Sequence, residues 1–273
     1  MVGKLGILAG GGELPARLIG ACRRNGRDVF VLAFEGQTNP ATVQGVDHAW
    51  TRLGQGGAAL AALRAAGVAE LVMAGAITRP SLSELRPDLR TVKFLAKIGV
   101  NCLGDDGLLR AVVAVLETEG FRVLGVDDVI TDLPARPGSY GALQPDAAAQ
   151  ADIARGIAVV RALGAVDVGQ AAVVQQGIVL GVEAAEGTDA LLGRCAGLRR
   201  NGPGGVLVKL RKPGQEARVD LPTIGVETVR NAAAAGLSGI AVQAGGALVV
   251  DPAAVSAAAD RAGLFVVGVE MPE

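Results

Sequence analysis

The chain has 273 residues, enough for one large domain or two domains of ordinary size. Half of the residues are hydrophobic, only 3% are aromatic and 40 are glycine, which is typical of a soluble α/β protein with an aliphatic core and many tight turns. The 26 Lys and Arg residues balance 27 Asp and Glu residues, and aromatic stacking surfaces are scarce, so we expect no nucleic-acid partner.

The cysteines and the apolar runs indicate the cellular compartment. Cys22, Cys102 and Cys195 are far apart, odd in number and without a C-x-x-C pattern, which favours a reducing cytoplasm. Glycines interrupt the N-terminal apolar stretch before a signal peptide could form. Apolar runs such as 239–250 are shorter than the roughly 20 residues that a membrane-spanning helix needs. We therefore expect a cytoplasmic protein.

Apolar runs and helical patterns alternate through the first part of the chain. The predicted strands are 4–10, 28–34, 70–76 and 121–126, and the predicted helices are 14–25, 57–66 and 108–119. Short, continuous apolar strands separated by helices are typical of a parallel sheet covered on both faces. The sequence therefore predicts an N-terminal Rossmann-like, parallel-sheet domain.

A stretch rich in proline and glycine, "TDLPARPGSYGALQP" at 131–145, interrupts this alternation and is expected to hold no regular structure. It separates a first domain at 1–135 from a second at 145–273. The second domain is predicted to contain helices at 147–163, from Thr188, at 227–235 and at 252–262. Its predicted strands flank a turn at Gln176-Gly177 and cover 204–210, 239–250 and 264–270. We expect a C-terminal α/β hydrolase-bearing domain.

The segment "LAGGGELP", residues 8–15, places three glycines between the first strand and the first helix. Backbone N–H groups at such a turn can surround a phosphate, and the first βα turn usually faces the ligand crevice of a parallel sheet. Gly10, Gly11, Gly12 and Glu13 are therefore candidate substrate-binding residues. The segment lacks the G-x-G-x-x-G pattern, so the alternative is that the small residues only serve packing.

Three other positions in the first domain have competing interpretations. Thr78 and Arg79 follow the third predicted strand at the same edge of the sheet, and an arginine there suits a phosphate, although a solvated loop explains it equally well. Asp105 and Asp106 begin a helix, where capping is the simpler explanation. His48 has no metal-binding or catalytic pattern around it, so we expect a structural or surface role.

The segment "VLVKLRKPGQEARVDLPTIG" in the second domain combines lysines with a carboxylate. Lys209 ends a strand, Lys212 follows it, and Asp220 comes after a polar turn. Phosphoryl transfer uses such groups, because carboxylates hold a divalent metal while ammonium groups neutralise phosphate oxygens. Asp220 is the sharpest catalytic candidate, with a helix-capping or turn role as its alternative.

A second acidic cluster lies upstream, in "GVEAAEGTDALL" at 181–192. Its acids are either a solvated turn with an ordinary helix cap or part of a cation site. Together with Lys209 and Asp220 they favour a phosphate-handling site that includes Glu186, Thr188 and Asp189. Glu183, nearer the strand, is expected to be structural.

Taken together, "LAGGGELP", "GDDGLLRAV", "VLGVEAAEGTDALL" and "VLVKLRKPGQEARVDLPTIG" resemble, in this order and over essentially the whole chain, the LpxI-type UDP-2,3-diacylglucosamine pyrophosphatases of lipid A biosynthesis. The pair "EGTDAL" and "K-P-G-Q-x-x-R-x-D-L-P-T-I-G" carries most of the resemblance. It implies a magnesium-dependent hydrolase that splits an acylated UDP-sugar into UMP and 2,3-diacylglucosamine 1-phosphate, called lipid X. Water is expected to attack the β phosphorus, the one attached to the sugar.

Carried onto this sequence, the resemblance places Asp220, Glu186, Thr188, Asp189 and Lys209 in the motifs of the family. Together with the residue chemistry, it makes Asp220, Lys209 and Thr188 the candidate catalytic residues and Asp220, Glu186 and Asp189 the candidate Mg²⁺ ligands, with Asp220 either binding the metal or accepting the proton of the attacking water. The glycine loop, Thr78, Arg79 and Lys212 are the candidate substrate-binding residues. The nucleotide side would bind the N-terminal domain, and hydrolysis would take place on the C-terminal domain. A lipid substrate further implies transient contact of a cytoplasmic enzyme with the inner membrane surface. The oligomeric state is open, with a homodimer as one alternative.

Two other classes of function compete with this hypothesis. The glycine-rich first βα turn also suits a nucleotide-dependent ligase or dehydrogenase, although the dinucleotide fingerprint is absent. If the acids are only solvated loops, the chain would be a non-catalytic nucleotide-sugar or lipid-binding protein.

Overall fold

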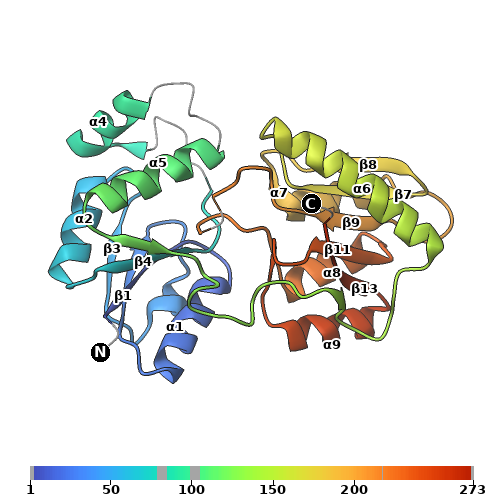
Figure 1. Ribbon diagram of the computed structural model, residues 1–273, viewed down its shortest axis with the longest axis horizontal. Helices are drawn as coiled ribbons and strands as arrows, with labels where there is room; N and C mark the ends of the chain where they lie inside the picture. The colour runs from blue at the N-terminus through green and yellow to red at the C-terminus, as the bar shows by residue number, and fades with distance from the viewer. Residues whose placement is uncertain (1–2, 79–84, 99–104, 217, 272–273) are drawn as a thin grey trace. The chain divides into compact units, whose positions relative to one another are not determined.

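The structure, a computed structural model, describes residues 3–78, 85–98, 105–216 and 218–271. The chain divides into two compact units (Figure 1). The first comprises Met1–Thr131 together with Glu216–Asp220, and the second comprises Asp132–Gln215 and Leu221–Glu273. The sequence had placed the two domains at 1–135 and 145–273. The five-residue segment Glu216–Asp220 therefore belongs to the first unit, although it lies far along the chain.

The described part of the first unit is built on a five-stranded sheet in the order β3-β2-β1-β4-β5. Each neighbouring pair runs parallel. The strands are β1 (Leu5–Ala9), β2 (Val29–Phe34), β3 (His48–Thr51), β4 (Glu70–Ala74) and β5 (Arg122–Leu124). The helices are α1 (Leu14–Arg24), η1 (Pro40–Val43), α2 (Gly56–Ala65), α4 (Leu89–Ile98) and α5 (Asp105–Thr118). The parallel sheet is confirmed.

Helices cover both faces of this sheet. Leu63 of α2 and Leu116 of α5 pack against Leu32 and Leu71 of the strands in one buried cluster. Helix α1 lies on the opposite face (Figure 1). The carboxyl ends of the strands are left to the connecting loops, and these loops hold the predicted glycine turn and Thr78.

The second unit contains a six-stranded sheet in the order β6-β13-β11-β9-β7-β8. Its strands are β6 (Gly138–Ser139), β7 (Ala171–Gln175), β8 (Ile178–Val182), β9 (Val206–Lys209), β11 (Gly239–Gln243) and β13 (Phe265–Val269). The central strands β9, β11 and β13 are parallel, whereas β6, β7 and β8 pair antiparallel. Short strands β10 (Thr223–Ile224) and β12 (Leu248–Val249) pair with each other.

Four helices cover the second sheet, and all four were predicted from the sequence. They are α6 (Ala147–Ala165), α7 (Gly187–Ala196), α8 (Val226–Ala234) and α9 (Pro252–Ala262). Ile153 and Val160 of α6 pack on one face of the sheet. Helices α7, α8 and α9 pack on the other, with Leu191 and Val255 in its core. The result is a three-layer α/β unit.

Two further observations bear on the sequence predictions. The proline-rich stretch at 131–145 was expected to hold no regular structure, but Gly138 and Ser139 form β6 along β13, because two residues suffice for a short edge pairing. Among the residues that the structure describes, no helix is long and apolar enough to cross a membrane.

Candidate functional site

The glycine loop after β1 is held against the loop after β4. Gly10 N donates to Ala74 O at 2.8 Å, and Gly11 and Ala76 exchange backbone hydrogen bonds at 2.8 and 3.1 Å. A Cβ atom on Gly10 would lie 2.4 Å from Ala76 O, so Gly10 is required for this close approach. Gly12 differs, because it has φ +81° and open space where a Cβ would lie. Packing therefore explains Gly10, whereas Gly12 offers open space at the sheet edge.

The glycine loop leads directly into α1. Glu13 is the N-cap residue, and its side chain makes no capping hydrogen bond. The first N–H groups of a helix have no partner within the helix and favour an anion nearby. This end of α1 is therefore suited to a phosphate group.

Two polar side chains that the sequence analysis did not single out fix the loops at this edge. The side-chain amide of Gln37 donates to Thr78 O at 3.1 Å and accepts from Thr78 N at 2.8 Å. The buried hydroxyl of Thr38 donates to Ala9 O and accepts from Phe34 N. Gln37 and Thr38 thus hold Thr78 and the end of β1. Arg79 lies outside the described residues.

Lys209 is buried at the carboxyl end of β9, with 7% of its surface exposed. Its Nζ donates to Thr223 O at 3.0 Å, which attaches the start of β10 to the central sheet. A buried ammonium group is costly unless it is hydrogen-bonded, and the bond to Thr223 O offsets part of that cost.

Thr188 lies in the first turn of α7, and a buried acid holds its hydroxyl group. Thr188 Oγ1 donates to Glu183 Oε1 at 2.5 Å, while Glu183 Oε2 accepts from Gln170 N at 3.0 Å. Glu183 is only 5% exposed. The acid that the sequence analysis regarded as structural therefore fixes the orientation of a predicted catalytic residue.

The two other acids of this cluster have separate partners. Glu186 forms an ion pair with Arg194 at 2.8 Å. Hydrogen bonds from its own backbone N–H and from Arg194 lower the pKa of Glu186. Asp189 Oδ1 accepts from Asn231 Nδ2 at 2.9 Å, beside a cavity of about 310 Å³ between α7 and α8. The two predicted metal ligands therefore have different partners, Arg194 for Glu186 and Asn231 for Asp189.

Lys212, a predicted phosphate contact, forms an ion pair with Asp167 at 2.6 Å. Asp167 has φ +54° and lies just beyond the end of α6. The Lys212 side chain is only 11% exposed, so this pair holds the segment after β9 against the end of α6.

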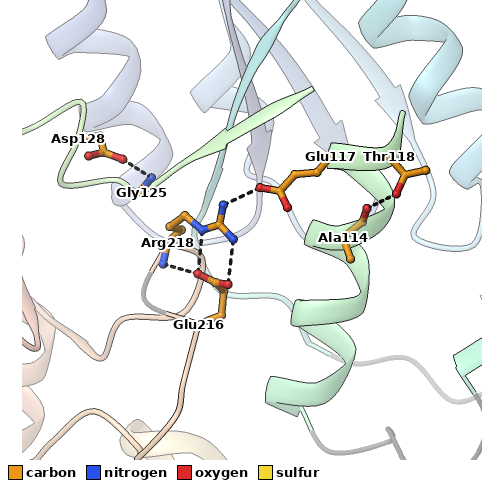
Figure 2. A network of polar contacts seen from close by, with 7 residues as sticks. All are labelled: Ala114, Glu117, Thr118, Gly125, Asp128, Glu216 and Arg218. Atoms are coloured by element: carbon orange, nitrogen blue, oxygen red, sulfur yellow. Dashed lines mark hydrogen bonds and ion pairs between the residues drawn. The ribbon is translucent and has the colours of Figure 1, made fainter. Parts of the chain in front are cut away.

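Asp220 lies in the short segment Glu216–Asp220, which belongs to the first unit. Figure 2 shows the polar contacts that Arg218 of this segment makes with Glu216 and Glu117. Its guanidinium group donates to both carboxylate oxygens of Glu216, at 2.9 and 3.0 Å, and to Glu117 of α5 at 2.6 Å. Hydrogen bonds to the two acids raise the pKa of Arg218, and the bond from Arg218 lowers the pKa of Glu216.

The acidic residues can be compared with what a resident metal ion would need. The described residues contain no group of three or more His, Cys, Asp or Glu side chains that could hold a metal ion. Mg²⁺ usually keeps several waters and is held by one or two carboxylates plus substrate phosphates. The described residues therefore offer no preformed three-carboxylate site.

Comparison with known proteins identifies the family. The family model of the LpxI N-terminal domain matches residues 4–133, and that of the LpxI C-terminal domain matches residues 136–267. A protein of Caulobacter vibrioides named UDP-2,3-diacylglucosamine pyrophosphatase LpxI is 44% identical over 277 residues, covering 99% of each chain. The two matches together span both units, and the chain belongs to the LpxI family.

Proposed function

We propose that this protein hydrolyses the pyrophosphate bond of UDP-2,3-diacylglucosamine, releasing UMP and 2,3-diacylglucosamine 1-phosphate. The observation that carries the proposal is the 44% identity, over 99% of both chains, to a protein named for this activity. The reaction would be a step of lipid A biosynthesis. The buried Lys209 and the held hydroxyl of Thr188 suit a phosphate substrate.

The first unit is proposed to be a Rossmann-like domain that binds the uridine nucleotide. The parallel strand order β3-β2-β1-β4-β5 supports this, because it is the order of the doubly wound nucleotide-binding folds. In such sheets the ligand lies beyond the carboxyl ends of the strands. There the N-terminus of α1 and the open side of Gly12 would receive a phosphate, and Gln37 would keep Thr78 in place.

Hydrolysis is proposed to proceed by attack of water on the β phosphorus. The water oxygen forms a bond to that phosphorus, the bond from phosphorus to the bridging oxygen breaks, and the bridging oxygen leaves with UMP. One proton of the water goes to a base, for which Asp220 is the proposed group. Lys209 and Thr188 would donate to non-bridging oxygens, where negative charge develops.

Magnesium is proposed to accompany the substrate. When bound, it would neutralise negative charge on the two phosphate groups. Asp189 is a proposed protein ligand, and Asp220 would be a second one in the alternative in which it binds the metal instead of acting as the base. Glu186 is the weakest of the three predicted ligands, because Arg194 already neutralises its carboxylate.

The substrate carries two acyl chains and would be drawn from a membrane. We therefore propose that the protein works in the cytoplasm and makes transient contact with the inner membrane surface.

The direct test is to incubate the protein with UDP-2,3-diacylglucosamine and Mg²⁺ and to measure the release of UMP. We expect turnover by the wild type and a loss of at least about 10²-fold in Asp220→Ala, the scale reported for removing a group that acts in the transition state. Asp47→Ala is the matched control, since Asp47 is an exposed aspartate of the same unit that pairs with Lys4. Absence of UMP release by the wild type would refute the function.

Isotope labelling tests the position of attack. In heavy-oxygen water, attack on the β phosphorus places the label in the sugar 1-phosphate, whereas attack on the α phosphorus places it in UMP. Chelation by EDTA is expected to stop the reaction, and added Mg²⁺ is expected to restore it. Full activity in EDTA would exclude the metal from the mechanism.

A further inference from the structure

The five residues Glu216–Asp220 belong to the first unit, although the chain before and after them belongs to the second. We propose that Arg218 is a positioning residue that fixes Asp220 to the first unit. This inference rests on the proposed function. It assigns to Arg218 a role that acts through Asp220, by determining where the Asp220 carboxylate lies.

The contacts of Arg218 suit an anchor. A planar guanidinium group can bind a carboxylate with two parallel hydrogen bonds, and Arg218 makes this contact with Glu216 of its own segment. A further nitrogen reaches Glu117 of α5. The Arg218 side chain is 36% exposed and that of Glu216 is 20% exposed, so the cluster is partly shielded from solvent. Arg218 therefore joins the segment to a helix of the first unit.

Backbone and apolar contacts hold the same segment. Val219 N and Asp220 N both donate to Glu216 O at 3.2 Å, which closes a tight turn. The Val219 side chain packs against the buried cluster that contains Leu116. Asp220 is two residues beyond Arg218, so their Cα atoms can be at most about 7 Å apart. A shift of Arg218 would therefore be passed on to Asp220.

The backbone just after Asp220 is also held, but within the second unit. Leu248 N donates to Pro222 O at 2.8 Å, and Lys209 Nζ donates to Thr223 O at 3.0 Å. With this downstream end attached, the Arg218 cluster acts together with the packing of Val219 on the upstream side of Asp220. Its removal would weaken the attachment of that side to α5.

Kinetics of the full-length protein test the proposal. We expect Arg218→Ala to lower kcat by about 10²-fold, the scale that a misplacement of about 1 Å produces, with little change in KM. Arg218→Lys should recover only part of kcat, because an ammonium group lacks the planar fork. Glu119→Gln is the matched control: Glu119 lies two residues after Glu117 but pairs with Arg64 and Arg90. Its kcat should stay close to that of the wild type.

A second measurement does not depend on catalysis. Hydrogen exchange at the amides of Val219 and Asp220 should become faster in Arg218→Ala and in Glu117→Gln, but not in Glu119→Gln. A wild-type kcat in Arg218→Ala, or unchanged exchange at these amides, would overturn the inference. A raised KM that Arg218→Lys restores would mean direct substrate binding and would also overturn it. Failure of the wild type to turn over the substrate would instead refute the proposed function. The hydrogen-exchange data would still show whether Arg218 holds the segment Glu216–Asp220.

Discussion

At the scale of single residues, the pairing of Thr188 with Glu183 explains why a buried acid stands next to a predicted catalytic hydroxyl. Glu183 accepts from Thr188 and from the Gln170 amide, so its charge is met by two donors within the second unit. The same contact leaves one rotamer of Thr188 favoured. A group that must meet a phosphate oxygen benefits from such preorganisation.

We predict that Thr188→Val lowers both stability and activity, whereas Thr188→Ser retains most of each. Valine has the shape of threonine but no hydroxyl, so Glu183 would lose a donor, at a cost of about 1–3 kcal/mol in the free energy of unfolding. Urea unfolding and initial rates of UMP release measure the two effects. Equal stability of Thr188→Val and the wild type would show that the contact with Glu183 contributes nothing.

At the scale of elements, the glycines of the first βα turn serve two different purposes, and substitution can separate them. Gly10→Ala would place a Cβ 2.4 Å from Ala76 O, so the two loops must move apart. Gly12→Ala meets no neighbour but must adopt φ +81°, which costs an L-residue about 1–2 kcal/mol.

We therefore predict that Gly10→Ala is the more destabilising of the two, while Gly12→Ala mainly weakens the binding of UMP. Thermal unfolding and calorimetric titration with UMP are the measurements, and Gly3→Ala is the control, since a Cβ there meets nothing. Unchanged UMP affinity in Gly12→Ala would argue against a phosphate at this turn.

Another element-scale prediction concerns Glu119, the residue after α5, which pairs with Arg64 of α2 and Arg90 of α4. The hydrogen bond from Arg64, followed by contacts with Arg90, lowers the pKa of Glu119 below 4.5. A carboxyl group whose pKa is lower in the folded state contributes stability above its unfolded pKa and loses that contribution as the pH falls through the folded value.

The destabilisation caused by Glu119→Gln should therefore be present at pH 7 and shrink as the pH falls below 4.5. Thermal unfolding across this range measures it. A difference between variant and wild type that stays constant down to the lowest pH would contradict the prediction.

Elements made of long apolar or alanine-rich runs were predictable from the sequence. Strands β1, β2 and β4 are largely apolar runs of five or six residues, and α6 is a 19-residue helix rich in alanine. Helix α4 was missed. Strand β3 was missed, since only one of its four residues is buried. Strands β6 and β10 have two residues each, so they carry no period at all. Strand β12 lies within the predicted strand 239–250, which the structure divides into β11 and β12.

At the scale of the whole molecule, the sequence proposed Lys209, Thr188 and Asp220 as catalytic candidates and placed Asp220 in the second domain, whereas Asp220 belongs to the first unit. The assignment depends on the contact of Arg218 with Glu117, 101 residues earlier in the chain. Local patterns carry no information about such a pair. The pattern K-P-G-Q-x-x-R-x-D contains Arg218, but it does not reveal that Arg218 pairs with Glu117.

The two units also have separate cores, which makes their ligand responses separable. The buried cluster around Leu116 lies in the first unit, and the clusters around Leu191 and Ile153 lie on the faces of the second sheet. A ligand that binds only the native state of one unit stabilises that unit by mass action, by about 2.7 kcal/mol at a concentration of 100 times Kd. Its effect on hydrogen exchange should therefore follow the unit that holds it.

We predict that UMP slows exchange in the first unit, around the glycine loop and β4, and leaves β7, β9 and β11 of the second unit unchanged. The physical reason is that the nucleotide is proposed to meet the parallel sheet and the N-terminus of α1, whereas the second unit would hold the sugar phosphate. Exchange measured by mass spectrometry with and without UMP provides the test, with Gly12→Ala as the weakened-binding control. If UMP instead slowed exchange in β9 and at the start of α7, the nucleotide would bind the second unit, and the proposed assignment of nucleotide to the first unit would be wrong.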